Sequence, residues 1–288
     1  MRTIAILCLG VPALAGAQAF DLPDIPVCLE LAPGAVAVSA EPVTLQLRVV
    51  LDGVSQDQGE AAVAAARSAY VPLNVALGVS YEIAGFSSSD GAALIEEARR
   101  RYGGRRPPGA HAVYVLTAKD LYLMDETGAR DTALVGLADC IGGIAYPEHA
   151  FAVGEAIADD PFGLGYAFGR NLAGKTLGHE VGHLVGGHHH YANCVETVAE
   201  LDDAPCTLMI NDLGLAALRF SSLNGLTLRG HAQFAGSPGF LQSDQSASSG
   251  GALSLPGLLV LIGFAAFGRR HAGPVNSSTS RISAVAAA

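Results

Sequence analysis

Five of the nine histidines lie close together, between residues 179 and 190. From residue 178 the chain reads Gly-His-Glu-Val-Gly-His-Leu-Val-Gly-Gly-His-His-His. On a helix His179 and His183 are one turn apart, so both imidazoles project from the same face and can bind one Zn²⁺. Glu180 can reach a water molecule on that metal. The types and spacing of these residues therefore predict a metal centre with a carboxylate beside it.

A third ligand has to come from outside the helix. Gly186 can take the positive φ that ends a helix, and the chain can then turn back so that His189 supplies a third nitrogen. The complete pattern is H-E-x-x-H-x-x-G-x-x-H. Other donors nearby could take the place of His189: His188, His190, Glu200 and Asp203.

The elements that must position these residues alternate between strands and helices. The helical, mostly apolar approach from Leu172 to Leu177 predicts that the motif lies on a helix. Earlier in the chain, alternation, capping residues and Ala-rich periodicity predict strands at 44–52, 79–84 and 111–117 and helices at 59–70 and 90–102. Strands that alternate with helices indicate an α/β body with a largely parallel sheet.

The charge balance excludes nucleic acid as a partner. Four of the 17 basic residues lie in the terminal segments, whereas all 27 acidic residues fall between Asp21 and Asp244. Such an acidic body would repel phosphates instead of neutralising them. Calcium could bind the acidic pairs Asp159-Asp160 and Asp202-Asp203, although pairs of this kind are usually solvated loops.

The patterns at both ends of the chain predict sorting signals. Arg2, the apolar run from Ile4 to Ala15 and the small residues before Phe20 predict a signal peptide at 1–19. Near the other end, 252–270 is an apolar segment closed by Arg269-Arg270. The body would then be 20–235, with a Ser/Gly-rich linker at 236–251 and a tail at 271–288.

The order Ser-Ser-Gly-Gly, apolar segment and Arg pair resembles the GlyGly-CTERM sorting tails of Gram-negative bacteria. The resemblance implies export, with a rhomboid-type protease and the secretion machinery as partners and with a secreted or surface-anchored product. This chain differs because His271 to Ala288 continue past the basic pair. A plain C-terminal membrane anchor is the alternative.

The cysteines agree with export. Four remain outside the signal peptide, an even number that favours two disulfides. Sequence allows three pairings; we expect Cys194 with Cys206, which are 12 residues apart, and Cys28 with Cys140. Alternatively, Cys28 is an inhibitory thiol on the metal.

The histidine motif resembles that of the metzincin clan of zinc endopeptidases. The family spacing selects His189 as the third ligand, and Met209 in Cys-Thr-Leu-Met stands where the family has a methionine turn beneath the metal. The resemblance implies a twisted, mostly parallel sheet with an antiparallel edge strand at 136–141 that holds an extended substrate, and a last helix at 221–234 in a small C-terminal subdomain. The tyrosine that many members carry after this methionine is missing, since Ile210 and Asn211 stand there.

The function implied is hydrolysis of peptide bonds with one catalytic Zn²⁺. Three neutral histidines would leave a position open to water, whose pKa the metal lowers, and Glu180 would act as the general base and then as the acid. Two alternatives remain: an exported zinc-binding protein for adhesion or assembly without peptidase activity, and a zinc amidase that acts on non-peptide substrates.

Overall fold

The computed structural model describes residues 25–124, 128–157, 171–194 and 206–242 of the chain. By its contacts the chain divides into two units, Met1–Gln242 and Ser243–Ala288, and all described residues belong to the first. The expected signal peptide and the apolar C-terminal segment therefore lie outside the described residues. Within those ranges, no helix combines the length and the apolar character needed to cross a membrane.

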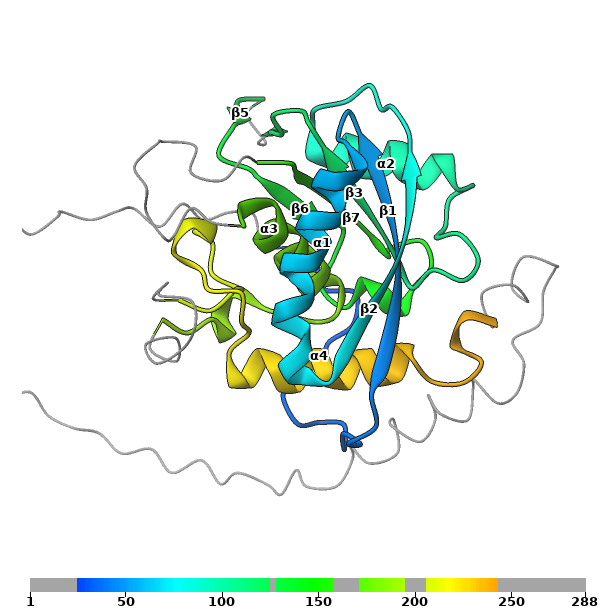
Figure 1. Cartoon of the computed structure of the whole chain (residues 1–288), viewed down its shortest axis with the longest axis vertical. Coiled ribbons are helices and arrows are strands. Elements are labelled where there is room, and N and C mark those ends of the chain that lie inside the picture. Colours follow the sequence, from blue (N-terminus) through cyan, green and yellow to red (C-terminus); the bar gives the residue numbers. More distant parts are fainter. Residues whose placement is uncertain (1–24, 125–127, 158–170, 195–205, 243–288) are drawn as a thin grey trace, which may run out of the picture. The chain divides into compact units, whose positions relative to one another are not determined.

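A five-stranded sheet in the order β2-β1-β3-β7-β6 forms the centre of the fold (Figure 1). Its strands in chain order are β1 (Val43–Asp52), β2 (Val75–Ile83), β3 (Ala112–Thr117), β6 (Gly136–Ala138) and β7 (Phe151–Glu155). The first four strands in the sheet order run parallel, and β6 pairs antiparallel with β7. The predicted α/β body with a mostly parallel sheet is confirmed, and the strand at its edge is antiparallel but shorter than the predicted 136–141.

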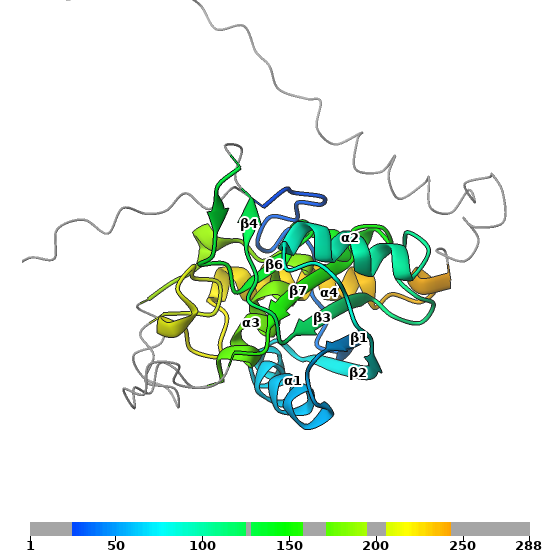
Figure 2. The ribbon, with the colours of Figure 1, turned by 90° about the horizontal axis from the view of Figure 1, so that it is seen from above.

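Helices cover both faces of this sheet. Helices α1 (Gln56–Tyr70) and α2 (Gly91–Arg101) lie on opposite sides of the strands (Figure 2). Two hydrophobic clusters result, one between the sheet and the α1 side, and a smaller one between the sheet and α2. Every residue of β3 is buried, because it lies between other strands and under both layers.

The starts of these helices follow from local capping. Ser55 and Gln58 form a capping box, so α1 begins earlier than the predicted residue 59. The Asp90 carboxylate accepts a hydrogen bond from the Ala93 N–H, and α2 begins directly after it, as predicted. Caps of this kind each contribute about 1 kcal/mol to stability.

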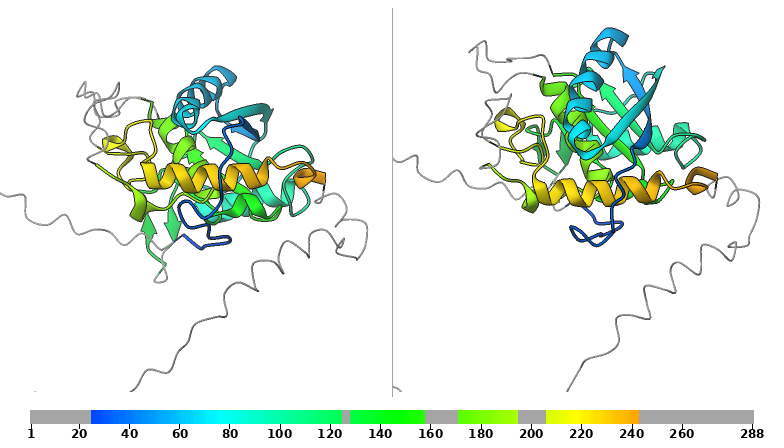
Figure 3. Two further views of the ribbon diagram at one scale, coloured as in Figure 1. Left: turned by 90° about the horizontal axis from the view of Figure 1, so that it is seen from below. Right: turned by 60° about the horizontal axis from the view of Figure 1, so that its bottom comes forward.

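Two further helices complete the fold. Helix α3 (Leu172–Leu184) packs against α1 and β7, and α4 (Ser222–Ala235) lies across the end of the sheet where β1 begins (Figure 3). The Ser221 hydroxyl accepts a hydrogen bond from the Asn224 N–H, so α4 begins where the sequence predicts a last helix.

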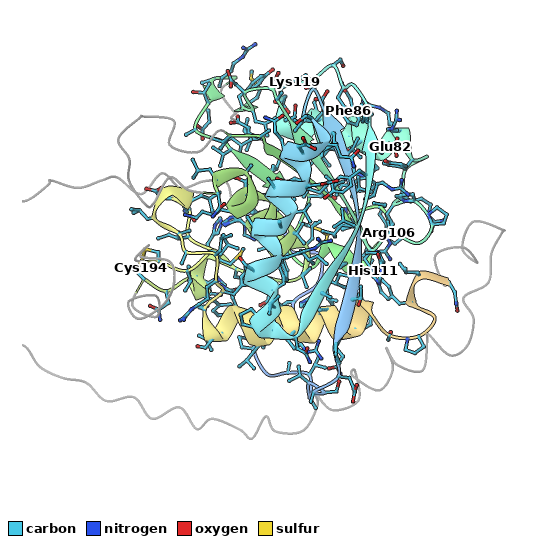
Figure 4. The ribbon with its side chains drawn as sticks, viewed as in Figure 1. Glu82, Phe86, Arg106, His111, Lys119 and Cys194 are labelled. Atoms are coloured by element: carbon cyan, nitrogen blue, oxygen red, sulfur yellow. A yellow bond between two sulfur atoms is a disulfide. The ribbon has the colours of Figure 1, made fainter. Side chains whose placement is uncertain are left out.

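The end of α4 is tied to the start of β3. The His111 ring accepts a hydrogen bond from the Gln46 N–H and donates one to the Ala235 carbonyl. Arg106, next to His111 in Figure 4, donates to the His111 carbonyl and lies over the Phe240 ring. Phe240, in the segment expected to be a linker, therefore packs against the body.

Three strands do not follow from the sequence pattern: β7, and the short antiparallel pair of β4 (Leu123–Met124) and β5 (Arg130–Asp131). Strand β7 lies between β3 and β6 and is almost wholly buried. Its sequence Phe-Ala-Val-Gly-Glu has no alternation because both of its faces are covered.

Candidate metal centre

Helix α3 presents His179 and His183 on one face, one turn apart. The helix is buried almost throughout, and three glycines at four-residue spacing let its neighbours approach. A Cβ at Gly174 would lie 2.5 Å from the Ala65 Cβ of α1, and a Cβ at Gly182 would lie 2.9 Å from the Met209 sulfur. Glycine is a poor helix former, so close packing offsets the propensity lost here.

The chain leaves α3 through a tight turn at Gly186. This glycine has φ of +85°, and its N–H donates to the His183 carbonyl at 2.8 Å. Beyond the turn, Asn224 of α4 accepts a hydrogen bond from the His188 N–H and donates one to the His188 carbonyl, at 2.9 and 3.1 Å. The Asn224 side chain therefore holds the backbone of His188, the residue directly before His189, in a fixed position.

The three imidazoles meet at their Nε2 atoms. The Nε2 atoms of His179 and His183 are 3.0 Å apart, and the Nε2 of His189 lies 3.1 and 3.0 Å from them, respectively. The cluster could hold a metal ion. This separation is close to the distance between ligand atoms around a small tetrahedral cation.

The hydrogen bonds at Nδ1 determine which tautomer His179 and His183 adopt. The Nδ1 atoms of His179 and His183 face the carbonyls of Leu208 and Gly187 at 2.7 and 2.8 Å. Because a carbonyl only accepts, each Nδ1 must be the donor, which leaves a lone pair on each Nε2 of a neutral ring. Lone pairs that face each other at 3 Å repel, and a cation between them removes the repulsion. The donor set therefore fits a zinc ion.

Burial keeps the rings of His179 and His183 neutral. Burial first, and then the neighbouring His189, lowers the pKa of His179 to about 3. Burial also lowers the pKa of His183 well below its ordinary value, with further contributions from His179 and His189. Neutral imidazole is the form that binds metal.

Glu180 follows His179 on α3 and is 4% exposed. The Ala138 N–H of edge strand β6 donates to its carboxylate, and Oε2 has no hydrogen-bond partner in the described part of the chain. Burial raises the pKa of Glu180 to about 8, and the hydrogen bond from Ala138 opposes the shift. A Cβ at Gly136 would lie 2.6 Å from Oε1, so this position of β6 needs glycine to leave room for the carboxylate.

Met209 is completely buried and lies against Gly182 and Gly187, at the end of α3 and in the turn that follows it. Its sulfur is close to Gly182 on α3, and the preceding Leu208 supplies the carbonyl that orients His179. The Thr207 N–H donates to the Asn193 carbonyl at 2.8 Å, so the segment is joined to the chain that follows the histidines.

Both disulfides are present with the expected pairing, Cys28 with Cys140 and Cys194 with Cys206. Cys194, labelled in Figure 4, and Cys206 bracket residues 195–205, which lie outside the described residues. The alternative of Cys28 as an inhibitory thiol is wrong, because its sulfur is bonded to that of Cys140.

The neighbouring histidines point elsewhere. His188 faces Glu30, with Nε2 and Oε2 3.3 Å apart, and His190 is exposed. Of the three candidates, His189 is the one whose ring joins the cluster. The acidic alternatives, Glu200 and Asp203, lie outside the described residues, as do the proposed calcium pairs Asp159-Asp160 and Asp202-Asp203.

The histidines line one part of a cavity of about 480 Å³. The cavity extends over edge strand β6 to the start of α2, and Asn211 and Leu213 contribute on the side of Met209. The ligand cluster is therefore open to a molecule that lies along the edge of the sheet.

The chain is similar to known proteins in three-dimensional structure and not in sequence. No protein-family model matches the sequence. No curated protein matches it. Among solved structures the chain is similar to archaemetzincin from Methanopyrus kandleri, with a TM-score of 0.45 and 20% identity over 66% of this chain and 96% of that one.

Two other solved structures are similar to a comparable extent. Metalloproteinase-II from Bacteroides fragilis gives a TM-score of 0.41 and 14% identity over 69% of this chain, and the match spans only 55% of that protein's length. A zinc-dependent peptidase from Methanocorpusculum labreanum gives a TM-score of 0.39 and 18% identity over 63% of this chain and 99% of that one.

Several residues of the site were not predicted from the sequence. Asn224 holds the backbone of His188, Ala138 holds Glu180, and the Leu208 carbonyl orients His179. Asn224 gave no signal beyond its place in the first turn of a helix, where asparagine is common for local reasons.

Proposed function

We propose that this protein is a zinc-dependent endopeptidase of the metzincin type, with one catalytic ion. The observation that carries the proposal is the convergence of three imidazole Nε2 atoms next to a buried carboxylate, in a cavity that runs along edge strand β6. His179, His183 and His189 would hold the zinc ion. A zinc ion there would lower the pKa of a bound water molecule and polarise a carbonyl group.

Glu180 would transfer a proton from the attacking water molecule to the leaving amine. Its Oε2 has no partner among the described residues, so it is free to take a proton from a water molecule in the cavity. The hydrogen bond from Ala138 holds the carboxylate in place while it passes that proton to the leaving amine. A structural zinc site would need no such base and is usually closed by a fourth protein ligand.

Edge strand β6 would hold the substrate. The hydrogen bonds from Asp139 N–H to the Phe151 carbonyl and from Glu155 N–H to the Val135 carbonyl show that odd-numbered residues pair with β7. In an antiparallel pair the alternate residues point the other way, so the N–H and C=O of Gly136 and the C=O of Ala138 face outward. An extended peptide could add to this edge.

The remaining features of the metzincin type support the same proposal. Met209 is buried against the end of α3 and α4 follows it in the chain, which supports a small C-terminal subdomain with a methionine turn. The segment from Met209 to Phe220 would contribute the pocket for the side chain after the scissile bond.

The decisive experiment measures both casein cleavage and zinc content of the Glu180→Gln variant. We expect one zinc per chain in both proteins and a fall of about 10²- to 10⁴-fold in casein cleavage, because only the base is removed. Glu60→Gln, at an exposed position of α1, is the matched control and should cleave normally. Undiminished cleavage by Glu180→Gln would overturn the assignment.

The rival functions predict different outcomes. An adhesion or assembly protein would bind zinc and cleave nothing in a proteome-derived peptide library. A zinc amidase would leave the library intact yet release amines from cell-wall or other non-peptide amides. We expect cleaved peptides in the library.

We also propose export, with removal of 1–19 and processing near the Gly-Gly pair of the C-terminal segment. The two disulfides support an oxidising compartment. The intact mass of the secreted protein tests both ends. A mature N-terminus other than Phe20, or a C-terminus at Ala288, would contradict the corresponding step.

A further inference from the structure

We propose that the cavity contains a second side-chain pocket, between β6 and the first turn of α2, that selects peptides with a large apolar residue at one position. This inference rests on the proposed peptidase function and names its substrate class. The pocket lies across the edge strand from the histidines.

Side chains on the two faces of β6 point toward different parts of the molecule. A Cβ at Gly136 would point at Glu180 and Thr176 of α3, and Ala138 belongs to the core cluster on that side. Leu137 points the opposite way and packs against the cluster beneath α2. The cavity is lined from both faces, so it continues past the edge of β6.

A peptide bound to this edge must follow the same alternation. Residues that lie opposite each other in a β-pair place their side chains on the same face. A substrate residue opposite Leu137 would therefore direct its side chain toward α2, while its neighbours face the metal side. Leu137 and its partner would form a non-hydrogen-bonded pair, in which the side chains lie closest.

The surface that receives this side chain is apolar and has room. Ala92 and Ala93, in the first turn of α2, are exposed and small. The pocket is completed by aliphatic residues from three segments: Ile25, Ile95, Leu134 and Leu137.

Charges at the border of the pocket are already paired. Arg99 binds both Glu96 and Asp139, with 2.8 Å between its Nη2 and the Asp139 carboxylate. His149 contacts the same carboxylate at 2.7 Å. A charged substrate residue would thus gain little here, whereas burial of a Leu or Phe side chain removes apolar surface from water and favours binding.

One end of the pocket is held in place by the N-terminal segment. Val27 pairs with Ile141 just beyond β6, and the Cys28–Cys140 disulfide joins the same two segments. The free edge therefore ends there, with Ile25 and Pro26 as a wall of the cavity. The pocket is formed before substrate arrives, so ordering it should cost little binding energy.

The test is Ala93→Trp, which fills the pocket from an exposed helix position. Peptides that differ only at one position, carrying Leu, Phe, Ala or Asp, are compared by kcat/KM. We expect the wild type to prefer Leu and Phe over Ala by about tenfold or more. In Ala93→Trp that preference should disappear, with the Ala peptide within about twofold of wild type. Ala64→Trp, at an exposed position of α1 away from the cavity, is the control and should keep the preference.

Binding of the same peptides to Glu180→Gln, followed by fluorescence polarisation, separates the two proposals. Cleavage with no loss of preference in Ala93→Trp would overturn the pocket and leave the peptidase standing. A preference in binding that Ala93→Trp abolishes, without cleavage by the wild type, would support the pocket and overturn the peptidase. Neither binding nor cleavage would overturn both.

Discussion

The imidazole of His231 occupies the space that a side chain at Gly186 would need. A Cβ on Gly186 would lie 2.3 Å from the His231 Cδ2 and 2.4 Å from its Nε2. His231, on α4, is completely buried against the turn that carries the chain from His183 to His189. Helix α4 thus packs against the turn that brings His189 to His179 and His183.

Gly186→Ala should therefore destabilise the protein and weaken zinc binding. A left-handed backbone costs a non-glycine residue roughly 1–2 kcal/mol, and the clash with His231 adds to it. Urea unfolding and zinc titration measure the two effects. Gly34→Ala is the matched control, since Gly34 has φ of +76° and nothing within 4 Å of the added Cβ. Equal losses in the two variants would show that the contact with His231 is unimportant.

Gly136→Ala should impair cleavage without removing zinc. The added methyl group would lie 2.6 Å from Oε1 of Glu180 and 2.7 Å from Cγ2 of Thr176, so the carboxylate must move. A displacement of about 1 Å in a catalytic group can cost about 100-fold in rate. Zinc per chain and kcat on casein are the measurements. Gly85→Ala, which meets nothing within 4 Å, should behave as wild type; a normal rate for Gly136→Ala would contradict the role of Glu180.

His189→Ala should weaken zinc binding, whereas His190→Ala should leave it unchanged. His189 places its Nε2 within 3.1 Å of the other two ligands, whereas His190 is exposed. Loss of a ligand should lower zinc affinity by about 100-fold or more, since even loss of an outer contact costs 10- to 100-fold. Competition with a chromogenic chelator gives the affinities. A weaker site in His190→Ala than in His189→Ala would reverse the assignment.

His231 should make the metal-free protein less stable in acid. Burial, followed by the nearby His188, lowers the pKa of His231 from 6.5 to about 4. As the pH falls below about 6.5, this histidine becomes protonated in the unfolded chain, whereas in the folded protein it stays neutral until about pH 4. The free energy of unfolding therefore decreases by about 3 kcal/mol as the pH falls from 6.5 to 4.

His231→Leu should remove this part of the pH dependence. The His231 ring nitrogens have no hydrogen-bond partner among the described residues, so leucine sacrifices no hydrogen bond there. Urea unfolding of both metal-free proteins at pH 7 and pH 4.5 measures how stability changes with pH, and the lowered pKa values of His179 and His183 contribute equally to the two proteins. An unchanged difference between the two pH values would refute the prediction.

The parts of the site that the sequence predicted are local ones. His179, Glu180 and His183 share a face of one helix because the helical period relates residues four apart whatever surrounds them. Asp90 and Ser221 mark helix starts for the same reason, since a cap acts on the next three residues. Strand β7 was missed because a strand covered on both faces loses the alternation that identifies it.

The tertiary structure decided which groups from elsewhere meet this helix. Residue type does not distinguish His189 from His188 and His190; Asn224, 36 residues beyond His188, holds the backbone so that His189 turns inward. The carbonyl of Leu208, the N–H of Ala138 and the missing side chain of Gly136 complete the site from three other segments. Backbone groups are the same in every residue, so only the fold determines which of them face the metal centre. The sequence by itself thus determined the helix that carries His179, Glu180 and His183, and packing decided which third histidine joins them, which tautomers His179 and His183 adopt and where the cavity lies.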